Sequence, residues 1–389
     1  MQKVLYVFGG EKASGAEIVL DRLMRYNKQV EPHLFISPGD YADRLINEHP
    51  YIITPSQYLK KLNRVNAGSF AFMWMALRNY LFLSAKVLRY IKKHQINIVH
   101  ANTVVPASYL IPALIWSKVF SGKTKWIWSD HDINFFSKLD HVFASTNLKW
   151  YDTTLTVSNA VKNKYKDKKD QSKASVLYNG LDVDHFKPDH SIRNHFRNEH
   201  EIDPEILVFG IAGNLSVRKG QLELLESIIR IRGKKNNVYL LIAGGLTDED
   251  RDYSDQIISL VSLHPHTAKY LGQVKDMLSF YNGCDVIVNN SNIAGSEPLG
   301  TTIYEAMACE KIVLASDTGG SKEIIDHLKN GRVFKAEDEG ALDTAIQYCI
   351  DDRGNLDQLK VSAREKVIDV FNIISMADNY NGVLNHLSK

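Results

Sequence analysis

Cysteine is scarce in this chain of 389 residues, which contains only three. Cys284, Cys309 and Cys349 are an odd number of thiols, widely spaced and set mostly among apolar residues. Such usage favours buried thiols in a reducing compartment over disulfide bridges or cysteine metal ligands. The histidines also lack metal-ligand spacing, and His264 and His266 are expected in a surface loop. We therefore predict a cytoplasmic protein without a metal site.

Signals for export and for membrane insertion are absent as well. Residues 1–8 are expected to form a strand that runs into a glycine turn, a segment too short and wrongly flanked for a secretory signal. The apolar stretch 67–85 approaches the length of a membrane span, but Arg78 interrupts it. Because an arginine at the centre of a bilayer is costly, we expect contact with a membrane surface and no span.

Short apolar strands alternate with segments of helical periodicity along most of the chain. A first series of strands is expected near residues 4–8, 32–37, 96–100, 125–129, 154–157 and 175–178. A second series is expected near residues 206–212, 239–244, 269–271, 286–289 and 312–316. Residues 186–204 hold prolines, histidines and charges with little apolar rhythm, and we predict a linker there. The pattern predicts an α/β fold with two doubly wound halves, for which the length and the 44% hydrophobic content suffice.

Charge is distributed unevenly between the two halves. Residues before the predicted linker carry more Lys and Arg than Asp and Glu, and the remainder is acidic by a similar margin. No acidic residue lies between Tyr51 and His100, where cations alternate with aromatic and aliphatic side chains. The cations are Lys60, Lys61, Arg64, Arg78, Lys86, Arg89, Lys92 and Lys93.

This basic, aromatic-rich segment, residues 58–93, predicts a surface that binds anionic lipid head groups. Each cation near such a membrane contributes on the order of 1 kcal/mol at low salt. The alternative is an ordinary core-facing helix with a solvated basic side. Nucleic acid is disfavoured as a partner because no recognised binding module accompanies the charge.

A predicted strand-to-helix turn follows residues 284–290, whose β-branched apolar core is typical of a buried parallel strand. Pro298 suits the first turn of the following helix. The N–H groups of Gly300, Thr301 and Thr302 would then face outward at the positive end of the helix dipole. Such an arrangement is suited to holding a diphosphate.

Two glutamates flank this turn. Glu297 would lie just before the helix and Glu305 within it, so that one carboxylate meets a sugar hydroxyl and the other a ribose. The alternative is that Glu305 is a solvated helix residue and Glu297 only offsets the helix dipole.

A second turn of the same kind runs from the strand that ends near Ala212 into a helix that begins near Gln221. Its last residues include Arg218 and Lys219, followed by Gly220. Two cations at a helix N-terminus could stabilise the negative charge that develops on a departing diphosphate. Taken alone, the same residues fit a solvated turn.

In this order and spacing, these residues resemble the retaining nucleotide-sugar glycosyltransferases of GT-B fold known as family four, or glycosyl transferases group 1. The resemblance covers nearly the whole chain. Besides the two turns, it rests on Gly9-Gly10 with Ser14-Gly15-Ala16-Glu17, on His131 in Ser129–Asp132, on Thr156-Val157-Ser158, on Asn179–Pro188 and on Gly319–Ile325.

The resemblance implies two Rossmann-like domains that face one another across a cleft. Residues 1–185 would form the acceptor-binding domain and residues 205–372 the nucleotide-sugar-binding domain. The last helix, about 373–389, would pack back onto the first domain.

Roles for individual residues are also implied by the resemblance. Arg218 and Lys219 would hold the diphosphate and Glu305 the ribose hydroxyls. Glu297 would contact the transferred sugar, with His131 on its other side. These implied contacts make Glu297, Lys219, Arg218 and His131 the candidate catalytic residues. Further donor contacts are expected from Gly10, Gly213, Asn214, Val274, Leu299, Gly300, Thr301 and Thr302, and acceptor contacts from Ser14, Gly15 and His131.

One position departs from the family pattern. Members commonly have Gly-Arg where this chain has Gly213-Asn214, and Asn214 cannot supply that positive charge. Some relatives that build bacterial surface polysaccharides carry an adjacent Arg-Lys-Gly, as here. Arg218 is therefore expected to provide the second cation.

The implied reaction moves a sugar from a nucleotide diphosphate, with UDP-sugars favoured by family frequency, to an acceptor hydroxyl with retention of configuration. No metal or other cofactor is expected. The acceptor is expected to be a lipid-linked or cell-surface glycan precursor at the inner face of a bacterial cell membrane. Alternatives are a GT-B enzyme with a soluble acceptor and a non-catalytic nucleotide-binding partner of another glycosyltransferase. A dehydrogenase is disfavoured because Gly9, Gly10 and Gly15 lack the dinucleotide fingerprint spacing.

Overall fold

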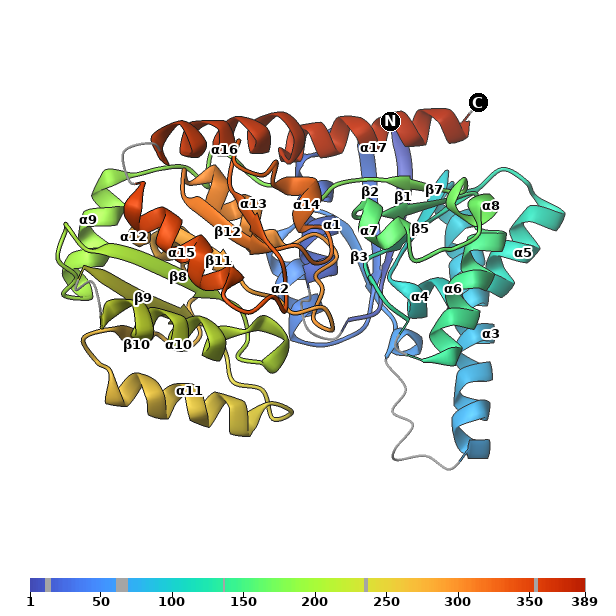
Figure 1. Cartoon of the computed structure of the whole chain (residues 1–389). Helices are drawn as coiled ribbons and strands as arrows, with labels where there is room; N and C mark the ends of the chain where they lie inside the picture. Colours follow the sequence, from blue (N-terminus) through green and yellow to red (C-terminus); the bar gives the residue numbers. More distant parts are fainter. Residues whose placement is uncertain (11–14, 61–68, 136, 234–236, 353–355, 389) are drawn as a thin grey trace. The chain divides into compact units, whose positions relative to one another are not determined.

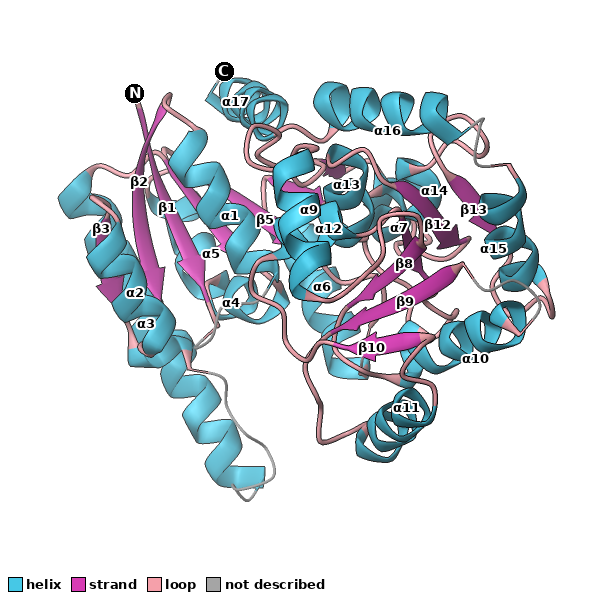
Figure 2. Ribbon diagram, turned by 90° about the vertical axis from the view of Figure 1, so that its left-hand side faces the viewer, coloured by secondary structure: helices cyan, strands magenta, loops and turns pink. Residues whose placement is uncertain are grey.

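The computed structural model describes residues 1–10, 15–60, 69–135, 137–233, 237–352 and 356–388. They form two units, each built around one parallel β-sheet (Figure 1). The first unit comprises Met1–Gly180 and Ile373–Lys389, and the second comprises Leu181–Asn372. The predicted α/β fold of two Rossmann-like halves is confirmed. Helices flank the strands of both sheets, as Figure 2 shows.

The sheet of the first unit has the strand order β3-β2-β1-β4-β5-β6-β7, and all its neighbouring strands are parallel. Its strands are β1 (Gln2–Phe8), β2 (Val30–Ile36), β3 (Ile52–Pro55), β4 (Ile98–Asn102), β5 (Lys125–Asp130), β6 (Thr153–Thr156) and β7 (Ala174–Val176). Its helices are α1 (Gly15–Tyr26), α2 (Asp40–Glu48), η1 (Gln57–Leu59), α3 (Ser69–His94), α4 (Val104–Tyr109), α5 (Ile111–Phe120), α6 (Lys138–Trp150), α7 (Asn159–Lys162), α8 (Lys168–Gln171) and α17 (Ile373–Ser388).

Strand β1 is an inner strand of this sheet, between β2 and β4, and is covered on both faces. Its residues 4–8 are fully buried, as expected for a strand of a parallel sheet with helices on both sides. Because successive side chains of a strand point to opposite faces, Tyr6 packs in one core with α1 and α17 while Val7 packs in another with α3 and α5. The last helix of the chain thus supplies part of the first unit's core, including Tyr380.

In the second unit, the strand order is β10-β9-β8-β11-β12-β13, again with parallel neighbours. Its strands are β8 (Leu207–Ala212), β9 (Val238–Ala243), β10 (Ala268–Tyr270), β11 (Val286–Asn289), β12 (Ile312–Ser316) and β13 (Arg332–Phe334). Its helices are α9 (His190–Glu199), η2 (Val217–Lys219), α10 (Gln221–Arg232), α11 (Arg251–Leu263), α12 (Met277–Gly283), α13 (Thr301–Ala308), α14 (Ser321–Ile324), α15 (Ala341–Asp351) and α16 (Leu356–Val370).

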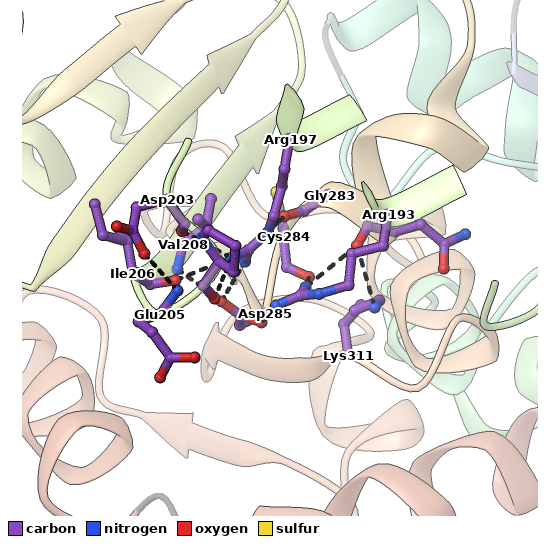
Figure 3. Close-up of polar contacts among 12 residues, drawn as sticks. Arg193, Arg197, Asp203, Glu205, Ile206, Val208, Gly283, Cys284, Asp285 and Lys311 are labelled. Atoms are coloured by element: carbon purple, nitrogen blue, oxygen red, sulfur yellow. Dashed lines mark hydrogen bonds and ion pairs between the residues drawn. The ribbon is translucent and has the colours of Figure 1, made fainter. Parts of the chain in front are cut away.

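The linker prediction for residues 186–204 needs correction, because this segment contains helix α9 and lies inside the second unit. Asp189 caps the helix because its Oδ1 accepts hydrogen bonds from the N–H groups of Ser191 and Ile192. Two arginines of α9 reach the sheet: Arg193 Nη2 and Arg197 Nη2 each lie 2.7 Å from a different carboxylate oxygen of Asp285 (Figure 3). Because arginines of α9 make this contact with the sheet, the sequence of α9 shows only a weak form of the apolar periodicity that marks a buried helix.

Strands β3 and β13 were not predicted. Both are edge strands of three or four residues, and most of their side chains are only partly buried. Strands this short give little apolar pattern.

Residues 61–68 of the predicted membrane-binding segment lie outside the described part of the chain. Helix α3, which follows them, exposes Trp74, Leu77, Leu81 and Phe82. In the described ranges, no helix combines the length and the apolar character that crossing a bilayer requires.

Candidate functional site

The loop between β8 and α10 is held by its own main chain and by Gln221. Gly213 has a φ of 142°, a conformation that side chains rarely adopt. The fully buried amide of Gln221 donates from Nε2 to the carbonyl oxygens of Gly213 (3.2 Å) and Asn214 (3.0 Å). A Cβ on Gly244 would lie 1.8 Å from the Gly213 carbonyl oxygen, so the neighbouring loop also packs directly on this turn.

The predicted cation pair lies in η2, at the end of this loop. Gly220 follows with a φ of 66°, and its carbonyl accepts a 2.9 Å hydrogen bond from Asn290 Nδ2. Lys219 forms an ion pair with Glu297. Arg218 is exposed, and its guanidinium has no ion pair or hydrogen bond to any described residue. The loop therefore presents one paired and one unpaired cation.

Glu297 receives three donors on a single oxygen. Its Oε1 accepts from Lys219 Nζ, from Asn289 Nδ2 (3.3 Å) and from Ser291 Oγ (3.2 Å). The side chain is only 15% exposed. Asn289 and Ser291 come from the end of β11, so two loops and one strand end determine the orientation of this carboxylate.

The main chain at Glu297 is in turn held by the glycine pair 319–320. Gly319 has a φ of 54°, and a Cβ there would lie 2.0 Å from the Glu297 carbonyl oxygen. The N–H of Gly320 donates to that same oxygen at 3.0 Å. These glycines, which belong to the segment 319–325 of the family resemblance, thus lie close to the protein's own main chain.

Helix α13 begins at Thr301, later than predicted, so Pro298 lies in the preceding loop. Gly300 is the N-cap, and its φ of 74° explains why the helix begins there. The first N–H groups of a helix have no acceptor within it and remain available to an anion. Glu305 lies in the second turn, where Tyr281 donates to its Oε2 at 2.8 Å.

Thus Arg218, Lys219 and Glu297 belong to the turns at the carboxyl ends of β8 and β11, and Glu305 lies in the helix that follows the second turn. Leu299 is buried and Thr302 is partly buried beside them, with Thr302 Oγ1 3.5 Å from Asn289 Nδ2. The exposed Thr301 opens the helix. Val274 lies in the loop after β10 and is partly buried. The sequence analysis missed Asn289, Ser291 and Tyr281, although the polar run that directly follows a buried strand was a usable signal for the first two.

His131 belongs to the first unit, where it directly follows β5. Burial lowers the pKa of His131 to about 4, and the charge of Lys164 adds to this effect. Its Nε2 is buried and has no hydrogen-bond partner in the described ranges. At neutral pH the imidazole is therefore uncharged.

The other residues predicted for the first unit lie on both sides of an undescribed segment. Gly10 lines a pocket, Gly15 begins α1, and Ser14 lies outside the described residues. Where the structure describes the chain, no group of three or more His, Cys, Asp or Glu side chains is arranged to hold a metal ion.

Known families match both units. The Glycosyltransferase Family 4 model matches residues 13–185, and the Glycosyl transferases group 1 model matches residues 192–366. The capsular polysaccharide biosynthesis glycosyltransferase CapM of Staphylococcus aureus is 26% identical over 194 residues, which are 50% of this chain and 49% of CapM. The N,N'-diacetylbacillosaminyl-diphospho-undecaprenol alpha-1,3-N-acetylgalactosaminyltransferase of Campylobacter jejuni is 29% identical over 151 residues, 39% of this chain and 37% of that enzyme. The chain spans about half the length of the curated relatives it matches.

Solved structures resemble the whole chain. HepE of Anabaena in complex with UDP has a TM-score of 0.81 at 21% identity and covers 99% of this chain and 100% of its own. A glycosyltransferase from Rickettsia africae has a TM-score of 0.82 at 21% identity and covers 100% of this chain and 99% of its own. With both units matched by family models and the fold shared over the full length, the chain belongs to the family-four glycosyltransferases of GT-B fold.

Proposed function

We propose that this chain is a retaining, metal-independent glycosyltransferase that moves a sugar from a nucleotide diphosphate, preferably UDP, to an acceptor hydroxyl. The observation that carries the proposal is the pairing of Lys219 with an oriented Glu297 next to the N-terminus of α13. Structures of HepE with UDP and with UDP-glucose support a uridine donor.

Diphosphate binding is assigned to the turns of the second unit. The guanidinium of Arg218 pairs with none of the described residues, so its charge is available to a phosphate, while Lys219 already lies beside a carboxylate. The free N–H groups at the start of α13 add fixed positive partial charge. These groups are in place before the bond to the sugar breaks, so they can stabilise the departing diphosphate without a metal. Glu305 is assigned to the ribose and Glu297 to the hydroxyls of the transferred sugar.

Retention of configuration follows from substitution on one face of the sugar. There the departing phosphate oxygen can itself take the proton of the acceptor hydroxyl, so no dedicated general base is assigned. The protein contributes mainly positioning and charge stabilisation. His131, uncharged at neutral pH because burial lowers its pKa to about 4, is assigned a positioning contact with the sugar rather than charge stabilisation.

The relative contributions of Arg218 and Asn214 to nucleotide binding can be measured directly. Arg218→Ala is expected to raise the Kd for UDP about tenfold or more, because a charge-assisted contact to phosphate is lost. Asn214→Ala should change the Kd less than threefold, since its side chain has no charge. Titration calorimetry with UDP measures both values. An Arg218→Ala protein with wild-type affinity would contradict the ranking.

The acceptor is proposed to be a lipid-linked or cell-surface glycan precursor, reached at the cytoplasmic face of a bacterial membrane. Two observations support this part of the proposal. Helix α3 exposes Trp74, Leu77 and Leu81 in a segment that has cations and no acidic residue. The matched Campylobacter jejuni enzyme is named for a diphospho-undecaprenol substrate.

Membrane binding is expected to require these exposed side chains. The double variant Trp74→Ser/Leu81→Ser should lower the fraction bound to phosphatidylglycerol vesicles about tenfold, because two exposed apolar side chains that would enter the membrane interface are lost. Leu263→Ser in the second unit, where Leu263 is 75% exposed, is the matched control and should bind like wild type. Vesicle flotation measures the bound fraction. Equal binding of the double variant and wild type, or no preference for anionic over phosphatidylcholine vesicles, would contradict the assignment.

A further inference from the structure

The first unit contains a pocket of about 550 Å³, large enough for a sugar residue with its neighbour. It opens among the ends of β1, β4 and β5, and Gly10 forms part of its wall. Its apolar lining residues include Leu59, Val105, Pro106 and Phe135. Its charged lining residues are four carboxylates, those of Glu17, Asp130, Asp132 and Asp140, and one lysine, Lys164.

That lysine is not available to an anionic ligand. Its Nζ lies 2.6 Å from Asp130 Oδ2, and the two side chains are only 7% and 1% exposed. Tyr165 donates to the same oxygen at 2.5 Å, and Lys164 also donates to the main-chain oxygen of Asp132. The positive charge is therefore used inside the wall, where it supports the loop that carries His131.

The carboxylate of Asp132, in contrast, can still accept hydrogen bonds. In the described part of the chain, no donor reaches its carboxylate, although the side chain is partly buried. Burial and the charge of Asp130 raise the pKa of Asp132, which indicates that nearby positive charge does not fully compensate it. Phe135 lines the same pocket. A carboxylate can accept hydrogen bonds from hydroxyl or ammonium groups of a ligand, and an aromatic ring can pack against its apolar face.

The net charge of the residues that line this pocket is opposite in sign to that of the unit around it. Residues 1–185 carry an excess of Lys and Arg over Asp and Glu, so the unit as a whole attracts anions. Among the described residues that line the pocket, carboxylates outnumber cations by four to one. A phosphate or carboxylate drawn to the unit would meet like charge there.

We propose that this pocket binds the acceptor through an uncharged or amino-bearing sugar and rejects a reacting unit that carries phosphate or carboxylate. This inference rests on the proposed function, because it assigns the acceptor of that reaction. It also places the reaction in a sequence. The acceptor sugar must already have been attached by an earlier transfer and is not the sugar that carries a lipid diphosphate, so this chain extends a glycan beyond its first sugar.

Four methyl glycosides of one ring test the proposal: methyl β-glucoside, its 2-amino-2-deoxy analogue, the glucuronide and the 6-phosphate. Ligand-observed NMR titration of the full chain gives the four Kd values. The neutral and amino glycosides are expected to bind at least about tenfold more tightly than the two anionic ones. Asp132→Asn should raise the Kd of the amino glycoside about tenfold and reduce the difference between its Kd and that of the glucuronide.

Asp43→Asn on α2 is the matched control, because it removes one exposed carboxylate from the same unit outside the pocket. It should leave all four Kd values unchanged, and thermal unfolding of both variants reports their folding. Equal or tighter binding of an anionic glycoside, binding of none of the four, or an Asp132→Asn protein with the wild-type order would overturn the inference. UDP titration of the same preparation separates the two proposals. UDP binding with the wrong glycoside order overturns only the acceptor assignment, whereas absence of UDP binding overturns the proposed function.

Discussion

Lys219→Ala is expected to lower kcat/KM for sugar transfer by about 10³-fold. Loss of one preorganised donor to a developing negative charge typically costs 10²–10³ in rate. Here the substitution also removes the ion-pair partner of Glu297, which leaves that carboxylate with two neutral donors among the described residues, Asn289 and Ser291. The carboxylate would then be free to turn away from the sugar it is proposed to contact.

The measurement is release of nucleoside diphosphate from the donor in the presence of acceptor-containing membranes. Lys329→Ala is the control, because Lys329 is exposed in the same unit and should retain wild-type turnover. Circular dichroism and the thermal midpoint establish that the Lys219→Ala protein is folded. A Lys219→Ala enzyme within tenfold of wild type would contradict the role assigned to this residue.

Asp285→Ala is expected to destabilise the second unit by about 3–5 kcal/mol, the usual cost of breaking a buried ion pair from one side. Asp285 accepts from Arg193, from Arg197 and from the N–H of Val208 (2.8 Å) (Figure 3). Arg197 is 3% exposed, so the substitution leaves a buried guanidinium without its counter-ion. Asp357→Ala should cost less than about 1 kcal/mol, because Asp357, the partner of Lys360, is 82% exposed.

Urea titration of the whole chain measures this difference. All five tryptophans lie in the first unit, so their fluorescence follows that unit, whereas circular dichroism follows both. The loss should therefore be seen mainly by circular dichroism. If Asp285→Ala unfolds at the wild-type urea concentration, the contact between α9 and the sheet does not stabilise the unit.

The same contact has a defined pH dependence. Burial acts to raise the pKa of Asp285, but the charges of Arg197 and Arg193 and the N–H of Val208 outweigh it and hold the pKa below its ordinary value. A carboxylate with a lowered folded-state pKa stabilises the fold above its unfolded pKa, about 4, and loses this contribution as the pH falls through the folded value. The stability difference between wild type and Asp285→Ala should thus stay constant from pH 7 to about pH 4 and shrink below that.

The alternation of strands and helices was readable from the sequence because central strands of parallel sheets are buried on both faces and form apolar runs. The runs that became β1, β8, β11 and β12 are examples. Helix α9 was not readable, since Arg193 and Arg197 occupy the positions that contact the sheet. Contacts between distant arginines and an aspartate have no periodicity along the chain.

The candidate site divides in a similar way. Lys219 and Glu297 follow predicted strands, and their types and spacing indicate phosphate and sugar contacts. Their ion pair joins residues 78 positions apart, so no local pattern reports it. No local pattern reports the role of Gly319 either. A glycine is required there because the main chain of Glu297 lies close to it, and not only because of the turn that contains Gly319.

The most direct test of the central claim is nucleotide-dependent thermal stabilisation of the purified chain with UDP, GDP, ADP, CMP and NADH in parallel. Wild type is expected to gain stability with UDP, by about 2.7 kcal/mol at a hundredfold excess over Kd. Lys219→Ala and Glu305→Ala should both lose the gain. Stabilisation by NADH alone, or by no nucleotide, would contradict the assignment of the second unit as the binding site of a nucleotide-sugar donor.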